Sequence, residues 1–98
     1  MYHATNTKNC TIEFKHVLPG SPEAIAGETP GTYCRIAFGV PEVQIITRTI
    51  LAEGDAYDSR LGNRMAFERA VALIPSKSRR AELWAGFLEL QSFVPHIG

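Results

Sequence analysis

Two kinds of hydrophobic periodicity divide the chain. Apolar side chains recur at every second position in the runs 10–18, 33–40 and 43–52, which is typical of β-strands with a buried face. In 59–74 and 77–93 they recur at every third or fourth position, which indicates helices. The pattern predicts an α+β fold in which a three-stranded antiparallel sheet precedes an antiparallel helical hairpin, in the order βββαα.

The rest of the chain sets the expected domain boundaries. Residues 1–9 are polar and aperiodic, which predicts a loose N-terminal arm, and residues 10–98 then form a single α+β domain. Between the first two strands, prolines and glycines at both ends of 19–32 indicate a long connection, and 22–26 is suited to one helical turn.

The third predicted strand is apolar on both faces. Val43 and Ile45 fall on one face, whereas Ile46 and Ile50 fall on the other. Such a strand is usually central, or its second face is covered by something else. Because one layer of helices covers only one face, a second copy of the chain is a candidate for the cover. The sequence therefore predicts a possible homodimer.

The predicted helices each carry an apolar stripe. Asp58 or Ser59 can cap the first helix, and Gly62 would allow its backbone to approach the sheet closely. Pro75 and Ser76 end that helix and cap the next one. The first stripe contains Asn63, Phe67, Ala70, Val71 and Ile74, with Leu61 and Met65 almost opposite; the second contains Trp84, Phe87, Leu88 and Gln91, widened by Leu83 and Leu90.

Charge is balanced in total but uneven along the chain. The net charge is −3 over residues 1–58, +5 over 59–80 and −2 over 81–98. Cations at a helix N-terminus oppose the helix dipole, so a partner or ion pairs to Glu82 and Asp58 must explain them. A phosphate backbone or an acidic protein would suit the basic block. The candidate binding residues are Arg60, Arg64, Arg69, Lys77, Arg79 and Arg80.

Candidate catalytic and metal-binding residues form no recognisable motif. Cys34 with His16 and Asp55 is a conceivable nucleophilic triad, but no nucleophile-elbow or phosphate-binding sequence supports an enzyme. Two cysteines in a chain of this length favour reduced thiols. The sequence predicts a non-enzymatic protein with no metal and no cofactor. Ligand-type residues that lack zinc spacing are His3, Cys10, His16, Cys34 and His96.

Two further features set the expected location. No apolar stretch is long enough to cross a bilayer, and the first residues lack the basic start and apolar run of a secretion signal. A cytoplasmic protein without a membrane partner is therefore expected.

The stretch 54–71 resembles a pattern found in small accessory proteins of bacteriophages and mobile elements, in which an aromatic residue precedes an apolar-Gly pair and an A-[LF]-x-R-A-[LV] helix. The chain lacks the C-x-P-x-D insert of that pattern and has Asn63 where an arginine is common. As a fold determinant, the motif would seat the helix on the sheet through Leu61, Phe67, Val71 and Ile74, with Arg69 outward. The matching residues are Tyr57, Leu61, Gly62, Ala66, Phe67, Arg69, Ala70 and Val71.

The resemblance implies a phage or mobile-element protein in a host cell. Some such proteins, including anti-CRISPR proteins, antagonise bacterial defence by binding without catalysis. The first hypothesis is accordingly an inhibitor that binds a host defence complex through a protein surface. The alternatives are a small nucleic-acid-associated protein that uses the basic helix face, and a ligand-binding or enzymatic domain centred on Cys34 and His16.

Overall fold

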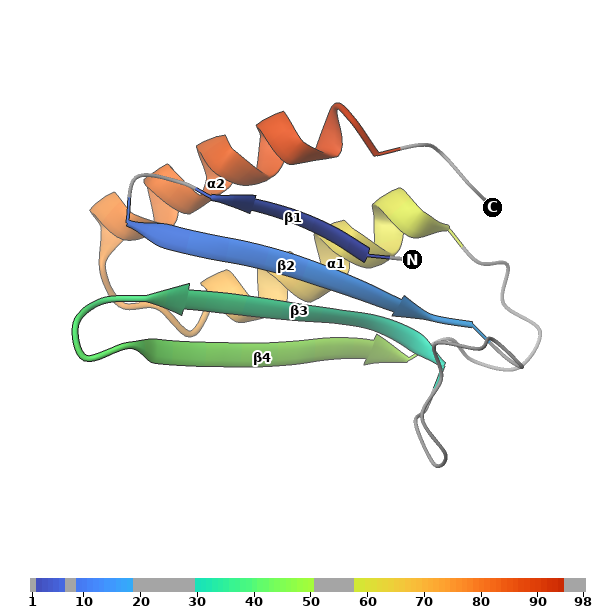
Figure 1. The fold of residues 1–98 in the computed structure, drawn as a ribbon, viewed down its shortest axis with the longest axis horizontal. Helices are drawn as coiled ribbons and strands as arrows, with labels where there is room; N and C mark the ends of the chain where they lie inside the picture. The colour runs from blue at the N-terminus through green and yellow to red at the C-terminus, as the bar shows by residue number, and fades with distance from the viewer. Residues whose placement is uncertain (1, 7–8, 19–29, 51–57, 95–98) are drawn as a thin grey trace.

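The computed structural model of the chain describes residues 2–6, 9–18, 30–50 and 58–94. Within these ranges a four-stranded antiparallel sheet carries both helices on one face (Figure 1). Each strand pairs with the next one along the chain. The elements in chain order are β1 (Tyr2–Asn6), β2 (Cys10–Val17), β3 (Gly31–Phe38), β4 (Val43–Ile50), α1 (Ser59–Val71) and α2 (Lys77–Gln91). The predicted α+β class and helical pair are confirmed, whereas the predicted number of strands is wrong by one.

The two helices divide the covered face between them. α1 packs on β3 and β4, and α2 packs on β1 and β2. α2 runs back in the direction opposite to α1, as the short connection between them predicts (Figure 1). The side chain of Asp58 caps α1 by accepting from the amides of Arg60 and Leu61 at 3.1 Å, and Ser76 caps α2 by accepting from Arg79.

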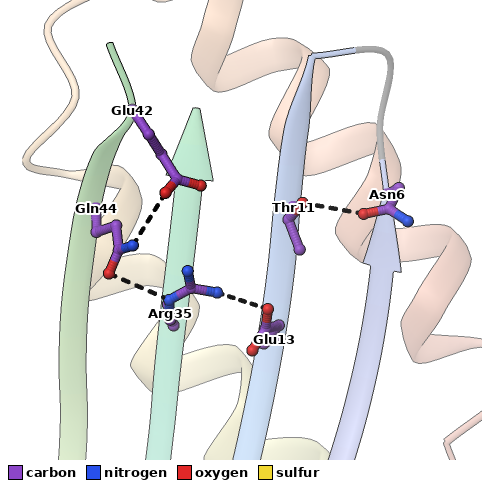
Figure 2. A network of polar contacts seen from close by, with 6 residues as sticks. All are labelled: Asn6, Thr11, Glu13, Arg35, Glu42 and Gln44. Atoms are coloured by element: carbon purple, nitrogen blue, oxygen red, sulfur yellow. Dashed lines mark hydrogen bonds and ion pairs between the residues drawn. The ribbon is translucent and has the colours of Figure 1, made fainter. Parts of the chain in front are cut away.

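Strand alternation gives the sheet two chemically different faces. The pairs Ile12–Ile36 and Phe14–Cys34 lie opposite each other across β2 and β3, and all four side chains are fully buried beneath the helices. The other face, called here the outer face, carries polar side chains such as Glu13 and Arg35 (Figure 2). No helix of the described residues lies over the outer face.

The N-terminal segment is a strand and not a loose arm. Residues 2–6 form β1, which pairs with β2 from Tyr2–Lys15 to Asn6–Thr11. Its sequence lacks apolar alternation because the positions that face the helices are His3 and Thr5, which are only half-buried. Backbone pairing with β2 is independent of side-chain hydropathy, so the periodicity of the sequence could not indicate this strand.

Of the two alternatives for the third predicted strand, the central position is wrong, whereas a cover over its second face stays a prediction. The corresponding strand, β4, is at the edge of the described sheet. Ile45 packs against the core, whereas Ile46 and Ile50 project from the outer face with 64% and 59% of their surface exposed. The apolar residues on this second face are therefore solvent-facing in the monomer. Residues 51 and 52, the predicted end of this strand, lie outside the described residues, as do the helical turn predicted at 22–26 and Asp55.

Aromatic rings fill the space between the sheet and the helices. Phe67 of α1 stacks on Phe87 of α2, with ring centroids 4.3 Å apart, and the edge of Trp84 meets Phe67 at 4.8 Å. Phe14 of β2 contacts the rings of Phe67 and Phe87 from the side of the sheet. The predicted stripes are confirmed for Asn63, Phe67, Ala70, Val71, Ile74, Leu83 and Phe87, which are buried, but Leu61 and Leu88 are exposed and do not seat the helices on the sheet.

Gly62 of α1 packs directly against Thr32 of β3. A Cβ atom at this position would lie 2.3 Å from the hydroxyl oxygen of Thr32, which is buried beneath the helix. Gly62→Ala is expected to lower the free energy of unfolding by about 1–3 kcal/mol, because overpacking outweighs the helix propensity of alanine, worth about 1 kcal/mol. Urea unfolding followed by circular dichroism measures the change. A variant as stable as the parent would contradict the close approach.

Candidate functional site

A groove of about 550 Å³ lies between the first half of α1 and the second half of α2. Its volume falls within the range of about 300–1,000 Å³ that is usual for binding sites. Because the helices run in opposite directions, the start of α1 and the end of α2 lie at the same end of the helix pair (Figure 1). The groove is lined by Asp58, Arg60, Leu61, Arg64, Trp84, Phe87, Leu88 and Gln91.

The groove combines an aromatic floor with exposed apolar walls. Phe87 is buried and Trp84 is half-buried, so their rings form the base of the groove. Leu61 on α1 and Leu88 on α2 expose 53% and 62% of their surface on the two sides. These leucines were predicted to pack in the core. Their exposure beside aromatic rings makes an apolar strip accessible to a partner.

Gln91 holds the two helices together at one end of the groove. Its amide nitrogen donates to the carbonyl oxygen of Arg60 at 2.7 Å, and its amide oxygen accepts from the amide of Asn63 at 3.2 Å. One side chain of α2 therefore contacts two residues of α1. This arrangement fixes the width of the groove where α1 begins.

Two of the predicted binding residues lie on the α1 side of the groove. Arg64 forms an ion pair with Glu68 at 3.0 Å on the same helix, and its side chain remains 66% exposed. The guanidinium of Arg60 makes no hydrogen bond or ion pair with any residue that the structure describes. An incoming carboxylate could pair with Arg60 without displacing a partner among residues 2–6, 9–18, 30–50 and 58–94.

The other predicted cations lie elsewhere. Lys77, Arg79 and Arg80 belong to the first turn of α2, at the end of the hairpin opposite to Arg60 and Arg64 (Figure 1). The structure therefore does not bring the six cations onto one surface.

The arginines of the second helix have partners within the monomer. Arg80 donates to the carbonyl oxygens of Ile74 and Pro75 at 2.7 and 2.9 Å, just beyond the end of α1. The guanidinium of Arg79 lies 4.6 Å from the ring centroid of Phe38, a cation–π distance, and contacts the Cys10 sulfur. These contacts explain cations that the helix dipole disfavours, because the arginines join α2 to its neighbours.

Arg69 lies beside the edge of the sheet. Its guanidinium donates to the backbone carbonyl of Arg48 in β4 at 2.8 Å. A side chain placed at an edge strand in this way is one means by which proteins limit edge-to-edge pairing. Part of the β4 backbone is therefore already engaged within the monomer, and the homodimer stays a prediction.

Two of the candidate triad residues, Cys34 and His16, are buried beneath the helices. Burial raises the pKa of the Cys34 thiol to about 12, so the thiolate form that a nucleophile needs is not populated near neutral pH. Burial, followed by the charge of His3, lowers the pKa of His16 to about 4. His16 lies 3.2 Å from the hydroxyl of Thr32, measured from its Nδ1 atom. This geometry favours a structural role for both side chains.

Across residues 2–6, 9–18, 30–50 and 58–94, no three His, Cys, Asp or Glu side chains lie close enough together to hold a metal ion. His96 and Asp55 lie outside these ranges. Neither described helix is long and apolar enough to cross a membrane.

The described residues form a small α+β domain with a groove between its two helices. No protein-family model matches the chain, and comparison with curated proteins and with solved structures finds no significant match. The resemblance over 54–71 to phage and mobile-element proteins therefore remains a basis for proposals.

Sequence reasoning found part of this site. It placed Arg60 and Arg64 beside the stripe of the first helix, but it assigned Leu61 and Leu88 to the core. The available signal was an apolar stripe wider than one sheet contact needs. The helix α2 contains five large apolar residues, of which only Leu83 and Phe87 are fully buried.

Proposed function

We propose that this chain is a non-enzymatic binding protein that holds an acidic amphipathic helix of a partner protein in the groove between α1 and α2. The observation that carries the proposal is the combination of exposed Leu61 and Leu88, the Trp84 ring and Arg60 in one groove. A helix laid in such a groove would place leucine-type anchors on the floor and carboxylates beside the arginines.

The residue types of the groove support a protein partner. Tryptophan and arginine are the side chains that most often dominate the energy of protein interfaces, particularly when they surround a pocket that excludes water. Trp84, Arg60 and Arg64 all line the groove. A nucleic acid would use the arginines but would leave the leucines exposed, so an amphipathic helix accounts for more of the surface.

Trp84 provides a direct test because it is the one tryptophan in the sequence. Its fluorescence is measured while a synthetic amphipathic helix, with a leucine stripe flanked by glutamates, is titrated into the protein. Saturable change in Trp84 emission is expected. A peptide with the same leucines flanked by lysines is expected to bind more weakly, because it would face Arg60 and Arg64 with like charge.

Leu88→Asp is expected to weaken binding of the acidic helix at least tenfold, because it places a desolvated carboxylate against the anchor of the ligand. The matched control is Leu73→Asp, since Leu73 is equally exposed, at 65%, but lies beyond the end of α1 and outside the groove. Both variants should fold normally, because both positions are on the surface. Equal loss of binding in the two variants would reject the groove as the site.

The proposed partner is a bacterial defence complex, and this step is based on the resemblance over 54–71. Purified RNA-guided nuclease complexes would be assayed for target cleavage with the chain in excess. Inhibition that is lost in Leu88→Asp and kept in Leu73→Asp would support the proposal. Absence of inhibition across the complexes, with the peptide still bound, would reject the target class and leave the groove intact.

A further inference from the structure

The register of the sheet builds a row of alternating aromatic and basic residues across the outer face. Tyr2 of β1 lies opposite Lys15 of β2, Lys15 lies opposite Tyr33 of β3, and Tyr33 lies opposite Arg48 of β4. Directly paired residues of adjacent strands project from the same face of a sheet. The four side chains therefore form one line that crosses every strand, although they are far apart in the sequence.

The spacing of this row follows from the sheet itself. Neighbouring strands lie about 4.8 Å apart, so Tyr2 and Tyr33 are separated by about 10 Å with Lys15 between them. Tyr2 exposes 60% of its surface, and Arg48 is exposed as well. Tyr33 and Lys15 are half-buried. The two rings and the two cations can thus contact a ligand that extends across the strands.

The charges around the row leave it positive. Glu13, which flanks the row on β2, forms an ion pair with Arg35 at 2.6 Å (Figure 2). Arg35 also donates to Gln44, whose amide in turn donates to Glu42 at 3.1 Å. The carboxylate of Glu13 is therefore paired with Arg35, and Lys15 and Arg48 add two positive charges to the row.

The shape of the surface selects among anionic ligands. The hollow beside Tyr2, Lys15 and Tyr33 has a volume of about 230 Å³, below the range of about 300–1,000 Å³ usual for small-molecule sites. A duplex would offer its phosphates but not the faces of its stacked bases. Exposed bases stack on aromatic side chains while cations contact the intervening phosphates, and this is how single strands bind to sheet surfaces.

We infer that the outer face binds single-stranded nucleic acid, with bases on Tyr2 and Tyr33 and phosphates at Lys15 and Arg48. This surface is on the side of the sheet away from the helices, so it is separate from the groove of the proposed function. It also differs from the predicted nucleic-acid site, which used cations of the helices.

The tyrosines give the first test. Binding of fluorescently labelled single-stranded DNA and RNA oligonucleotides is measured by fluorescence anisotropy at low salt. Tyr2→Ala combined with Tyr33→Ala is expected to weaken binding by more than tenfold, because each lost stacking contact alone is worth about fivefold or more. The conservative pair Tyr2→Phe and Tyr33→Phe should keep most of the affinity, since phenylalanine preserves the ring.

The cations give an independent readout. Lys15→Gln combined with Arg48→Gln is expected to reduce the dependence of log affinity on log salt by about 1.4, or about 0.7 for each phosphate contact with a single strand. Arg60→Ala, in the groove on the other side of the molecule, should leave both affinity and salt slope unchanged. A matched duplex should bind more weakly than the single strand.

Several results would overturn the inference. They are the absence of saturable binding of both oligonucleotides at low salt, equal affinity of the double alanine variant and the parent, or loss of affinity in Arg60→Ala equal to that in the outer-face variants. A preference for RNA over DNA would show that the 2′-hydroxyl is read as well, and would support the same surface. Circular dichroism of each variant verifies that its fold is retained.

Discussion

Replacing Phe67 with alanine is expected to lower the free energy of unfolding by about 4 kcal/mol, within the range of about 3–5 kcal/mol for buried aromatic residues. Phe67 is fully buried and contacts the rings of Phe87, Trp84 and Phe14. Its ring joins both helices to the sheet, so its removal leaves a cavity that no single neighbour can fill. Chemical unfolding followed by circular dichroism measures the loss.

Phe93→Ala is the matched control for this prediction. Phe93 follows α2 and exposes 78% of its surface, so the same truncation should cost less than about 0.5 kcal/mol. Domains of this size are stable by only about 5–15 kcal/mol in total, and Phe67→Ala should therefore unfold at a much lower urea concentration than the parent. Similar midpoints for the two variants would show that the ring cluster is not the centre of the core.

The sequence predicted those strands and helices in which the buried positions are apolar and therefore give a hydropathy period. Alternation marked β2 and β3 because one face of each is covered by helices, and Phe67 and Phe87 marked the buried sides of α1 and α2. The sequence did not predict β1, because the residues of β1 that face the helices are polar. A strand that is held mainly by backbone hydrogen bonds has no hydropathy pattern. The strand β1 could therefore be recognised only from its pairing with β2 in the folded structure.

The groove and the row of residues on the outer face could likewise be predicted from the sequence only in part. Arg60 and Arg64 could be found from the sequence, because they are one helical turn apart and their relation is local. Leu88 could not be separated from the core, because exposure depends on how far the helix is rotated relative to the sheet. The row from Tyr2 to Arg48 depends on the register of three strand pairs, and no local spacing contains that register.

His16 is a titratable side chain in the core, so its protonation is expected to destabilise the fold. It is fully buried on β2, and the ring of His3 lies 5.3 Å away, edge to face. The fold excludes water from the ring, so burial is the main cause that lowers the pKa of His16 to about 4. Protonation would place a charge in the core and repel protonated His3, which has a lowered pKa for the same reason.

The stability of the protein is therefore expected to fall as the pH drops from about 6.5 to about 4. In this window the unfolded chain binds a proton at His16, with its pKa near 6.5, and the folded protein does not. The stability that neutral His16 contributes is fully present above about pH 6.5. Its total loss is at most about 3–4 kcal/mol, since each unit of pKa shift is worth about 1.4 kcal/mol.

His16→Gln separates this effect from the titration of the carboxylates. Glutamine keeps a polar side chain near Thr32 but does not titrate, so the variant should lose less stability than the parent between neutral pH and about pH 5. The measurement is the urea midpoint of both proteins at matched pH values. If the two proteins lose stability in parallel as the pH falls, His16 is not the group that takes up the proton on unfolding, and another side chain must carry the acid sensitivity.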